Sequence, residues 1–347
     1  MRPDSATPLI EVRDLRTHFF TDEGVVKSVD GVSFDIPRGK TLCIVGESGC
    51  GKSITARSIL KLIAPPGRIV SGQILYNRDP AQPPVDIVGL SQRSQELRAI
   101  RGREIAMIFQ EPMSALSPVH TIGDQVSETI LLHERVGRVE AKARAIKLLD
   151  RVGIPRAASR FDAYPFQLSG GMRQRACIAM ALACSPKLLI ADEPTTALDV
   201  TTQANILDLI AELQAEMGMA VMFITHDLGV VAEIADEVVV MYLGTVAERG
   251  DVFSIFRDPQ HPYTRALMRS IPRLGEAGGR LESIRGIVPH PSNRPTGCPY
   301  HTRCDSYMPG ICNRVDPRLE DIGDGHLVRC LLHSDRETPV NAGELAR

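Results

Sequence analysis

The hydrophobic positions of the chain gather in short apolar runs, each of which ends at a glycine or a polar residue. Such runs are typical of buried strands, and stretches with helical spacing lie between them. Strands that alternate with helices predict an α/β fold with a parallel sheet. Because ligands of such sheets bind beyond the carboxyl ends of the strands, chemistry is expected directly after each run. The runs are Lys40–Val45, Ile105–Phe109, Lys187–Ala191, Ala220–Ile224 and Val238–Leu243.

Two parts of the chain depart from this alternation. The stretch from Gly123 to Phe161 has a mostly helical pattern, clearest in Glu140–Val152, and predicts an inserted helical subdomain at about 111–185. After Arg257, proline, glycine and cysteine become frequent and the periodicity fades, so we place a boundary there. The expected organisation is a main domain at 1–257 and a C-terminal region at 258–347.

Composition and charge narrow the class of protein. Of the 347 residues, 43% are hydrophobic and 24% are charged, as in an ordinary globular protein with a large core. The formal net charge of −2 gives no basic field, so nucleic acid is not expected as a partner. The first residues lack the apolar stretch of a secretory signal, and no run approaches the roughly 20 apolar residues of a membrane-spanning helix. We expect a cytosolic protein whose membrane role depends on a partner.

A phosphate-binding loop is predicted where the first run ends. Residues 46–53 have the sequence G-E-S-G-C-G-K-S, which matches G-x-x-x-x-G-K-[ST], and a helix-compatible segment follows. Glycines let the backbone wrap so that its N–H groups and the helix N-terminus face phosphate oxygens. The lysine supplies a point charge to the β- and γ-phosphates, and the serine hydroxyl can ligate Mg²⁺. The residues expected to bind the nucleotide are Gly46, Glu47, Ser48, Gly49, Cys50, Gly51, Lys52, Ser53 and Ile54.

Two adjacent carboxylates, Asp192 and Glu193, follow the apolar run K-L-L-I-A. Neighbouring side chains of an extended strand point to opposite faces, so the two carboxylates need not share a role. Asp192 suits the Mg²⁺ shell, and Glu193 can orient or deprotonate the water that attacks the γ-phosphate. An isolated acidic pair at a strand end would more often only face solvent, so other motifs have to decide.

The segment L-S-G-G-M at 168–172 resembles the signature motif of the ABC ATPases. A serine cap and two glycines at the start of a helix offer hydroxyl and N–H donors to an anion. Other motifs of the family stand in the expected order: Gln110 resembles the Q-loop residue, Ala197-Leu198-Asp199 the D-loop and His226 the switch histidine. Methionine at position 172, where the family usually has glutamine, is common in its peptide and nickel importers.

The resemblance implies a P-loop NTPase fold, with a RecA-like core, an antiparallel β subdomain, an inserted helical subdomain and a small cysteine-containing C-terminal extension. It also implies an ATPase in which two such domains clamp two nucleotides head to tail. The phosphate loop of one domain then faces the signature motif of the other. By this resemblance Lys52, Glu193, His226 and Gln110 are catalytic, Ser53, Gln110 and Asp192 hold Mg²⁺, and Ser169, Gly170, Gly171 and Asp199 lie at the nucleotide and the dimer seam.

The resemblance further implies partners and a location. They are two transmembrane permease subunits, a second ATPase that is a copy of this chain or a paralogue, and, indirectly, a solute-binding protein. The chain would lie on the cytoplasmic face of the bacterial cell membrane and power the import of dipeptides or oligopeptides. The segment Q-E-P-M-S-A-L-S-P that starts at Gln110 resembles the surface that receives the membrane subunit. Import of nickel or another small solute is the alternative; a non-transport ABC ATPase is disfavoured because the chain has a single motif set.

Two assignments near the phosphate loop stay open. The adenine base is expected to stack on an aromatic residue upstream of the loop, and the spacing L-x-x-x-F favours Phe19 over Phe20, although either ring could instead pack in the core. Cys50 lies inside the loop near a helix N-terminus, which tends to lower a thiol pKa and would make the thiol reactive. The alternative is that Cys50 is a small neutral packing residue.

The C-terminal region contains four of the eight cysteines: Cys298, Cys304, Cys312 and Cys330. Disulfides are not expected in a reducing cytosol, so these thiols are candidates for a metal site. The pattern G-C-x-x-H-x-R-C, which includes Cys298 and Cys304, resembles the C-terminal extension of the peptide and nickel importers. That resemblance implies a [4Fe–4S] cluster; zinc, or four reduced thiols without a metal, are the alternatives.

Overall fold

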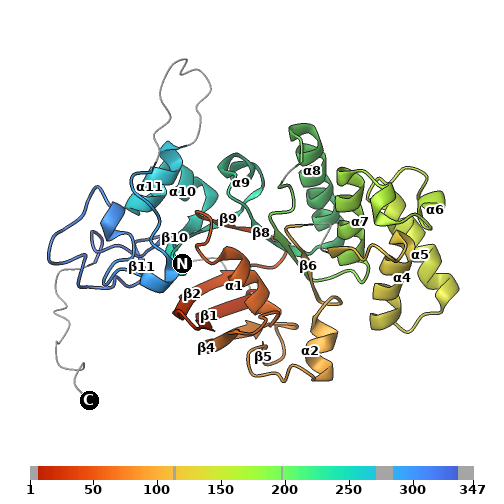
Figure 1. Ribbon diagram of the computed structural model, residues 1–347, viewed down its shortest axis with the longest axis horizontal. Coiled ribbons are helices and arrows are strands. Elements are labelled where there is room, and N and C mark those ends of the chain that lie inside the picture. Colours follow the sequence, from red (N-terminus) through yellow and green to blue (C-terminus); the bar gives the residue numbers. More distant parts are fainter. Residues whose placement is uncertain (1–6, 112–114, 197, 271–283, 335–347) are drawn as a thin grey trace.

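The computed structural model describes residues 7–111, 115–196, 198–270 and 284–334 (Figure 1). These residues form two β-sheets and a group of helices. The larger sheet crosses the centre of the protein, the smaller sheet lies below it in Figure 1, and a bundle of helices extends to the right. This is the α/β arrangement that the alternation of apolar runs predicts.

The smaller sheet is antiparallel and has the strand order β2-β1-β4-β5. Its long strands pair in antiparallel register, and paired positions carry buried hydrophobic side chains such as Ile10, Val12 and Ile74. This sheet is the antiparallel β subdomain that the family resemblance implies, and its presence is confirmed. The strands are β1 (Ile10–Thr21), β2 (Gly24–Ile36), β4 (Gly67–Tyr76) and β5 (Val85–Asp86), and helix α2 (Gln95–Ile100) follows them.

The larger sheet has the order β11-β12-β10-β9-β3-β8-β7-β6, and its strands from β9 to β6 are parallel. All five apolar runs predicted as strands form this parallel part. Every residue of β3, β7 and β8 is buried, as expected for strands that helices cover on both faces. The bounds are β3 (Thr41–Val45), β6 (Ile105–Ile108), β7 (Leu188–Asp192), β8 (Ala220–Ile224), β9 (Glu237–Tyr242) and β10 (Thr245–Asp251).

Helices fill two different places around the larger sheet. Some pack against the sheet itself: α1 (Lys52–Ile59), α8 (Val200–Met217), α9 (Leu228–Ile234) and α10 (Val252–Arg257). Others form the group on the right of Figure 1, in which Ala145 and Leu149 are fully buried. That group is the predicted inserted subdomain, and it consists of α4 (Ile122–His133), α5 (Arg138–Arg151), α6 (Ala157–Arg160) and α7 (Gly170–Leu182).

The C-terminal region is joined to the larger sheet. Helix α11 (Pro262–Arg269) follows α10, and two short strands, β11 (Glu320–Asp321) and β12 (Leu327–Val328), extend the sheet through β10. The proposed boundary at Arg257 falls at the end of α10. The described residues beyond that boundary therefore continue the main sheet, and the division at 257 stays a proposal.

A buried carboxylate fixes this attachment. Glu248 on β10 is fully buried and accepts hydrogen bonds from the backbone N–H groups of Gln260 at 2.7 Å and His261 at 2.9 Å. The Nε2 atom of His326, which lies just before β12, is 2.7 Å from its carboxylate. Burial opposes ionisation of Glu248, but the bond from His326 and its other hydrogen bonds hold its pKa below the ordinary value. The same bond raises the pKa of His326.

Replacing His326 with leucine is expected to lower the free energy of unfolding by about 2 kcal/mol near pH 6, because a charged hydrogen bond is lost. A histidine whose folded-state pKa is raised contributes this stability fully below its ordinary pKa and loses it as the pH rises through the raised value. The difference between wild type and His326→Leu in thermal unfolding should therefore shrink from pH 6 to pH 9. The exposed His120 provides a control substitution; an equal difference at both pH values would contradict the prediction.

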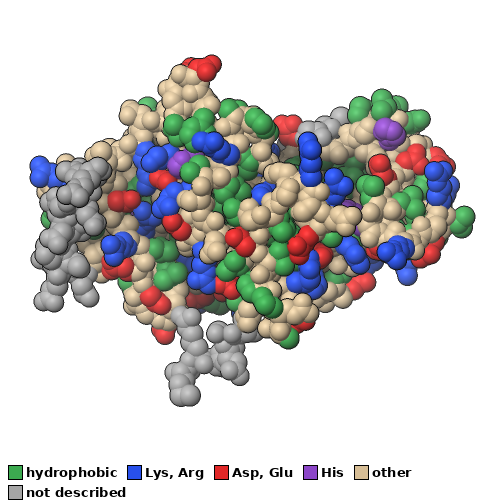
Figure 2. Space-filling model, turned by 90° about the horizontal axis from the view of Figure 1, so that it is seen from below, with side chains coloured by type: hydrophobic (Ala, Val, Ile, Leu, Met, Phe, Trp, Pro, Cys, Tyr) green, Lys and Arg blue, Asp and Glu red, His purple; other side chains and the backbone are tan. Residues whose placement is uncertain are grey.

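The face of the protein drawn in Figure 2 has no single dominant charge. On this face, basic and acidic side chains are interspersed. Among the described residues, no helix is both long enough and apolar enough to span a bilayer.

Candidate functional site

The predicted phosphate loop connects the carboxyl end of β3 to the first residue of α1, Lys52. Its glycines are required by close backbone approach and by positive φ. A Cβ atom on Gly46 (φ 149) would lie 2.2 Å from the carbonyl oxygen of Met241, and one on Gly51 (φ 102) 2.2 Å from that of Ser28. The loop is thus pressed against the neighbouring strands, which sets its shape before any ligand binds.

The ammonium group of Lys52 lies within this loop. It donates to the carbonyl oxygens of Gly46 at 2.7 Å and Glu47 at 3.2 Å, and the residue is only 6% exposed. Phosphate oxygens are charged acceptors and would form stronger bonds with the same donor than neutral carbonyls do. Lys52 is therefore already placed where the sequence predicts a phosphate contact.

A pair suited to a divalent cation lies beside the loop. Ser53 Oγ donates to Asp192 Oδ1 at 2.9 Å, and Asp192 is fully buried at the end of β7. Its other oxygen, Oδ2, is buried and has no hydrogen-bond partner among the described residues. Burial accordingly raises the pKa of Asp192. A hydroxyl and an unsatisfied buried carboxylate oxygen are ligands that Mg²⁺ prefers, so the donors fit such an ion.

Three other side chains surround the carboxylate of Glu193. Its Oε2 accepts hydrogen bonds from Gln110 Nε2 at 3.0 Å and from Thr196 Oγ1 at 3.1 Å, and His226 Nδ1 lies 3.6 Å away. Asp192 and Glu193 thus face different partners, as the sequence predicts, although Glu193 lies in the turn after β7 rather than on the strand itself. Gln110, expected also near Mg²⁺, contacts Glu193 rather than the Ser53–Asp192 pair.

Thr196 is a site residue that the sequence analysis missed. It lies three positions after Glu193, and only the tight turn between β7 and α8 brings its hydroxyl to the carboxylate. Glu193 itself has a positive φ of 48°, an uncommon conformation for a residue with a side chain. Such a conformation persists only where the surroundings enforce it, and it marks this turn as a constrained part of the site.

The signature segment lies elsewhere on the same chain. Ser169 caps α7, and its Oγ accepts a bond from the N–H of Met172 at 3.3 Å, while Ser169 and Gly170 are exposed. A Cβ atom on Gly170 would meet nothing within 4 Å. Helix α7 packs against α4, α5 and β6, whereas α1 packs against β1, β2 and β7, and the two helices lie apart in Figure 1. The signature segment therefore presents open donors and does not complete the phosphate loop of its own chain.

The D-loop residue Asp199 lies next to the signature segment. Asp199 caps α8 and accepts bonds from the N–H of Thr202 at 2.9 Å and its hydroxyl at 2.7 Å, which lower the pKa of the carboxyl. A Cβ atom on Gly171 would lie 3.1 Å from the methyl carbon of the same threonine. The two motifs therefore share one exposed surface. Ala197 lies outside the described residues, as do 112–114 of the segment expected to receive a membrane subunit.

The aromatic candidates for adenine differ in their surroundings. Phe20 is 38% exposed, and the guanidinium of Arg68 lies 4.2 Å from its ring centre. Phe19 is half-buried, and a Cβ atom on Gly67 would come within 2.5 Å of its ring. Neither arrangement decides between them, and Phe19 stays a prediction.

Cys50 has the surroundings of a packing residue. It is 1% exposed, and burial raises its pKa although the charge of Lys52 acts in the opposite direction. A thiolate is the reactive form of cysteine, so the structure disfavours the reactive-thiol hypothesis and favours the neutral one.

Two of the four C-terminal cysteines are joined through their backbones, because the N–H of Cys298 donates to the carbonyl of Cys312 at 2.8 Å. Cys304, Cys312 and Cys330 each contribute, after burial, to a raised pKa of about 12 for Cys298, and burial also raises the pKa of Cys304 to about 11. In the described part of the chain, however, no three or more His, Cys, Asp or Glu side chains are arranged to hold a metal ion. The expected zinc or iron–sulfur site is therefore not supported by the geometry of these thiols.

Two residues of the C-terminal region reach the phosphate loop, and the sequence analysis missed both. Arg303 donates two hydrogen bonds to the carboxylate of Glu47, and Tyr263 Oη accepts one from the backbone N–H of Glu47 at 2.9 Å. These residues lie more than 200 positions from Glu47 in the chain, so no local pattern could have indicated the contacts.

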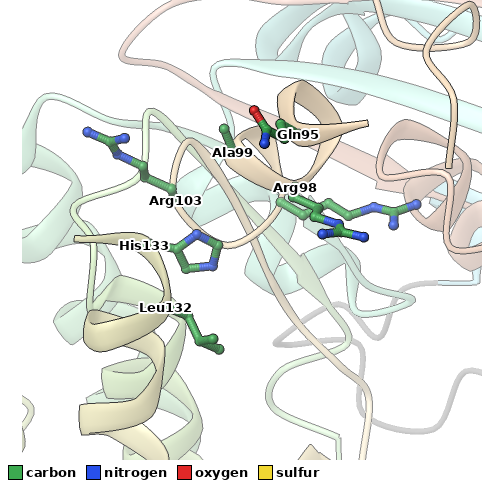
Figure 3. A pocket seen from close by; sticks show the side chains of 7 residues that line it. Gln95, Arg98, Ala99, Arg103, Leu132 and His133 are labelled. Atoms are coloured by element: carbon green, nitrogen blue, oxygen red, sulfur yellow. The ribbon is translucent and has the colours of Figure 1, made fainter. Parts of the chain in front are cut away.

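A basic hollow between α2 and the end of α4 is a separate feature (Figure 3). Arg103 precedes β6 while Gln110 follows it, so the hollow is at the opposite end of that strand from the site around Glu193. Arg101 is already bonded to backbone oxygens of Leu60 and Lys61. The hollow is lined by Gln95, Arg98, Ala99, Arg101, Arg103, Leu132 and His133.

Comparisons with known proteins agree with this arrangement. The sequence profile of the family described as ABC transporter matches residues 29–196, and that of the oligopeptide/dipeptide transporter C-terminal region matches residues 247–312. The chain is 47% identical to the dipeptide transport ATP-binding protein DppD of Bacillus subtilis, over 97% of this chain and 98% of that one. It is 46% identical to the protein of the same name from Escherichia coli, over 93% and 96%.

Solved structures with the same architecture include a dimeric ATP-binding cassette in a post-hydrolysis state bound to ADP and Pi. The two are 26% identical, with a TM-score of 0.61 over 70% of this chain and 98% of that chain. The cbiO1 protein of Clostridium perfringens, part of an ABC transporter complex, is 28% identical with a TM-score of 0.60, over 73% and 92%.

Proposed function

Because the chain belongs to the ABC transporter family, in the branch with the oligopeptide/dipeptide transporter C-terminal region, we propose that it is the ATP-hydrolysing subunit of a peptide importer. The observation that carries this proposal is the grouping of Gln110, Thr196 and His226 around Glu193, next to the Ser53–Asp192 pair. A cation-binding pair and a separately held carboxylate, both beyond a phosphate loop, are the parts that phosphoryl transfer to water requires.

The proposed roles follow from this geometry. Lys52 exchanges its loop carbonyl partners for the β- and γ-phosphates of ATP. Ser53 and Asp192 hold Mg²⁺, which when bound offsets the charge of the phosphate oxygens. Glu193 accepts a proton from the attacking water or orients it, and Gln110 and His226 hold the carboxylate toward the γ-phosphate.

The second half of each nucleotide site comes from a partner ATPase in this proposal. Ser169 and Gly170 are exposed donors at the start of α7, a helix that lies apart from the phosphate loop of its own chain. A structural relative whose solved structure is a dimer bound to ADP and Pi supports the same arrangement. The partner is a second copy or a paralogue, and Asp199 lies at the seam.

The remaining assembly follows from the branch. Permease subunits span the membrane, a solute-binding protein delivers the cargo, and this chain is peripheral on the cytoplasmic side. Dipeptides or oligopeptides are the proposed cargo because the relatives are dipeptide transport proteins; nickel or another small solute is the alternative. We further propose the division into a main domain at 1–257, with its helical insertion at about 111–185, and a region at 258–347.

The proposal for the four cysteines is a [4Fe–4S] cluster. Its support is only the family pattern around Cys298 and Cys304, because the described thiols are not arranged to hold a metal ion. Binding would require the thiols to rearrange and lose their protons, because burial now raises the pKa of Cys298, Cys304 and Cys330. Iron and sulfide analysis of anaerobically purified protein tests it, with absorbance near 400 nm expected. A colourless protein that contains zinc or no metal would contradict it.

The proposed function is tested by co-expressing the chain with its permease subunits and partner ATPase and reconstituting the purified complex in lipid vesicles with the solute-binding protein. We expect ATP hydrolysis that dipeptides stimulate and uptake of labelled dipeptide that requires ATP. Stimulation and uptake with Ni²⁺ but not with peptide would instead favour the alternative cargo. An assembled complex that binds ATP but never splits it would contradict the enzyme assignment.

A further inference from the structure

A buried arginine of the C-terminal region is bonded to the phosphate loop. Arg303 Nη1 donates to Glu47 Oε2 at 2.7 Å, and Nη2 donates to Glu47 Oε1 at 3.1 Å. The Arg303 side chain is 3% exposed, and that of Glu47 is 25% exposed. Although burial disfavours its charge, bonds to Glu47 and Tyr242 raise the pKa of Arg303. A two-pronged bond of this kind fixes both the distance and the orientation of the carboxylate.

The backbone of Glu47 is held by the same region. Its N–H donates to Tyr263 Oη at 2.9 Å, and Tyr263 is fully buried in α11. The Tyr263 ring packs against Tyr242 at 4.7 Å and Tyr300 at 5.3 Å between ring centres. Glu47 is thus restrained at both backbone and side chain by residues that lie beyond Arg257.

Arg303 is positioned by the turn that carries two of the four thiols. The short helix His301–Arg303 lies between Cys298 and Cys304. The N–H of His301 donates to the carbonyl of Cys298 at 3.1 Å, and the Arg303 N–H donates to that of Tyr300 at 3.0 Å. The conformation of this turn therefore decides where the guanidinium lies.

Restraint and charge at Glu47 both bear on nucleotide affinity. A loop that is already fixed loses less conformational entropy when it closes on a ligand. An unpaired carboxylate in a phosphate loop would also repel the triphosphate, and the guanidinium offsets that charge. The carbonyl of Glu47 is one of the two oxygens that hold Lys52, so movement at Glu47 also displaces the lysine.

We propose that Arg303 is a positioning residue of the nucleotide site, through which the C-terminal region sets the affinity for ATP. It acts through Glu47, by fixing the phosphate loop and neutralising its acidic side chain. This inference rests on the proposed ATP-binding function and adds a residue from outside the ATPase motifs.

The test is to measure ATP binding by calorimetry and the steady-state kinetics of the assembled complex. Arg303→Met is expected to weaken ATP binding by about tenfold and to raise KM, with kcat at saturating ATP within about twofold of wild type. Arg303→Lys keeps the charge but cannot form the two-pronged bond, so it is expected to weaken ATP binding by about threefold. The double variant Glu47→Gln/Arg303→Met should bind ATP more tightly than Arg303→Met alone, because the unpaired carboxylate is gone.

A second arginine, whose side chain is 14% exposed, provides the matched control. Arg294 donates to Asp30 on β2 at 2.7 Å and also attaches the C-terminal region to the rest of the protein, but its ion pairs are with Asp30 and Asp316. Arg294→Met should lower the unfolding temperature and leave ATP affinity unchanged. A general loss of packing would weaken ATP binding in both variants, and that result would overturn the inference.

The outcomes separate the inference from the function on which it rests. A folded Arg303→Met protein with wild-type ATP affinity overturns the inference alone, whereas a wild-type protein that does not bind ATP overturns the proposed function. If Arg303→Met does not fold, Arg303→Lys replaces it. A weakening of about threefold that Glu47→Gln removes is then the expected result, and unchanged affinity in Arg303→Lys is the contrary one.

Discussion

Replacing Glu193 with glutamine is expected to abolish ATP turnover while leaving ATP binding intact. Glutamine keeps the shape of the side chain and can still contact Gln110 and Thr196, but it cannot accept a proton from water. Loss of a general base or of the group that orients water lowers turnover by about 10²- to 10⁴-fold. Because the γ-phosphate then stays in place, the two ATPase chains should remain closed on it.

Two measurements check this prediction. Phosphate release from the assembled complex gives the loss of turnover, and light scattering of the ATPase pair in ATP and Mg²⁺ gives the closed dimer. Glu212→Gln is the matched control, because it changes an acid to an amide on α8 at an exposed ion pair with Arg151 of α5, and it should behave as wild type. Wild-type turnover in Glu193→Gln would remove Glu193 from its catalytic role.

Lys52→Ala and Ser169→Arg are expected to abolish turnover at two different stages. Removing the lysine takes away the loop ammonium, so the single chain should lose ATP binding. The arginine at position 169 would occupy the open surface at the start of α7 without touching the phosphate loop of its own chain. The single Ser169→Arg chain should therefore bind ATP normally, while turnover of the assembled pair falls by at least about 100-fold.

Nucleotide binding to single chains and turnover of assembled pairs distinguish the two stages. Ser159→Arg, at another exposed serine of the helical subdomain, is the control and should change neither. If the chain pairs with itself, mixing the Lys52→Ala and Ser169→Arg proteins should restore turnover, because one site then has both residues. Loss of ATP binding in the single Ser169→Arg chain would show that both residues belong to one self-sufficient pocket.

The phosphate loop and the parallel strands could be predicted because the features that define them are local. Positive φ at Gly46 and Gly51, the lysine at the helix start and the short apolar run that forms each of β3, β7 and β8 involve residues within a few positions of one another. The pairing of Gln110 and His226 with Glu193 spans longer separations. The sequence indicated it only through the order of the family motifs, and the carboxyl ends of parallel strands then brought the three together.

What the sequence determined by itself is the set of parallel strands, the helical insertion and the backbone chemistry of the phosphate loop, since hydrogen bonding and glycine conformations act over short stretches of chain. Only the tertiary structure decided which side chains surround that loop. Burial made Cys50 a packing residue, the turn after β7 brought in Thr196, and attachment of the C-terminal region to β10 placed Arg303 against Glu47. These outcomes depend on contacts between distant segments, because burial and charge pairing are properties of the folded surroundings rather than of neighbouring residues.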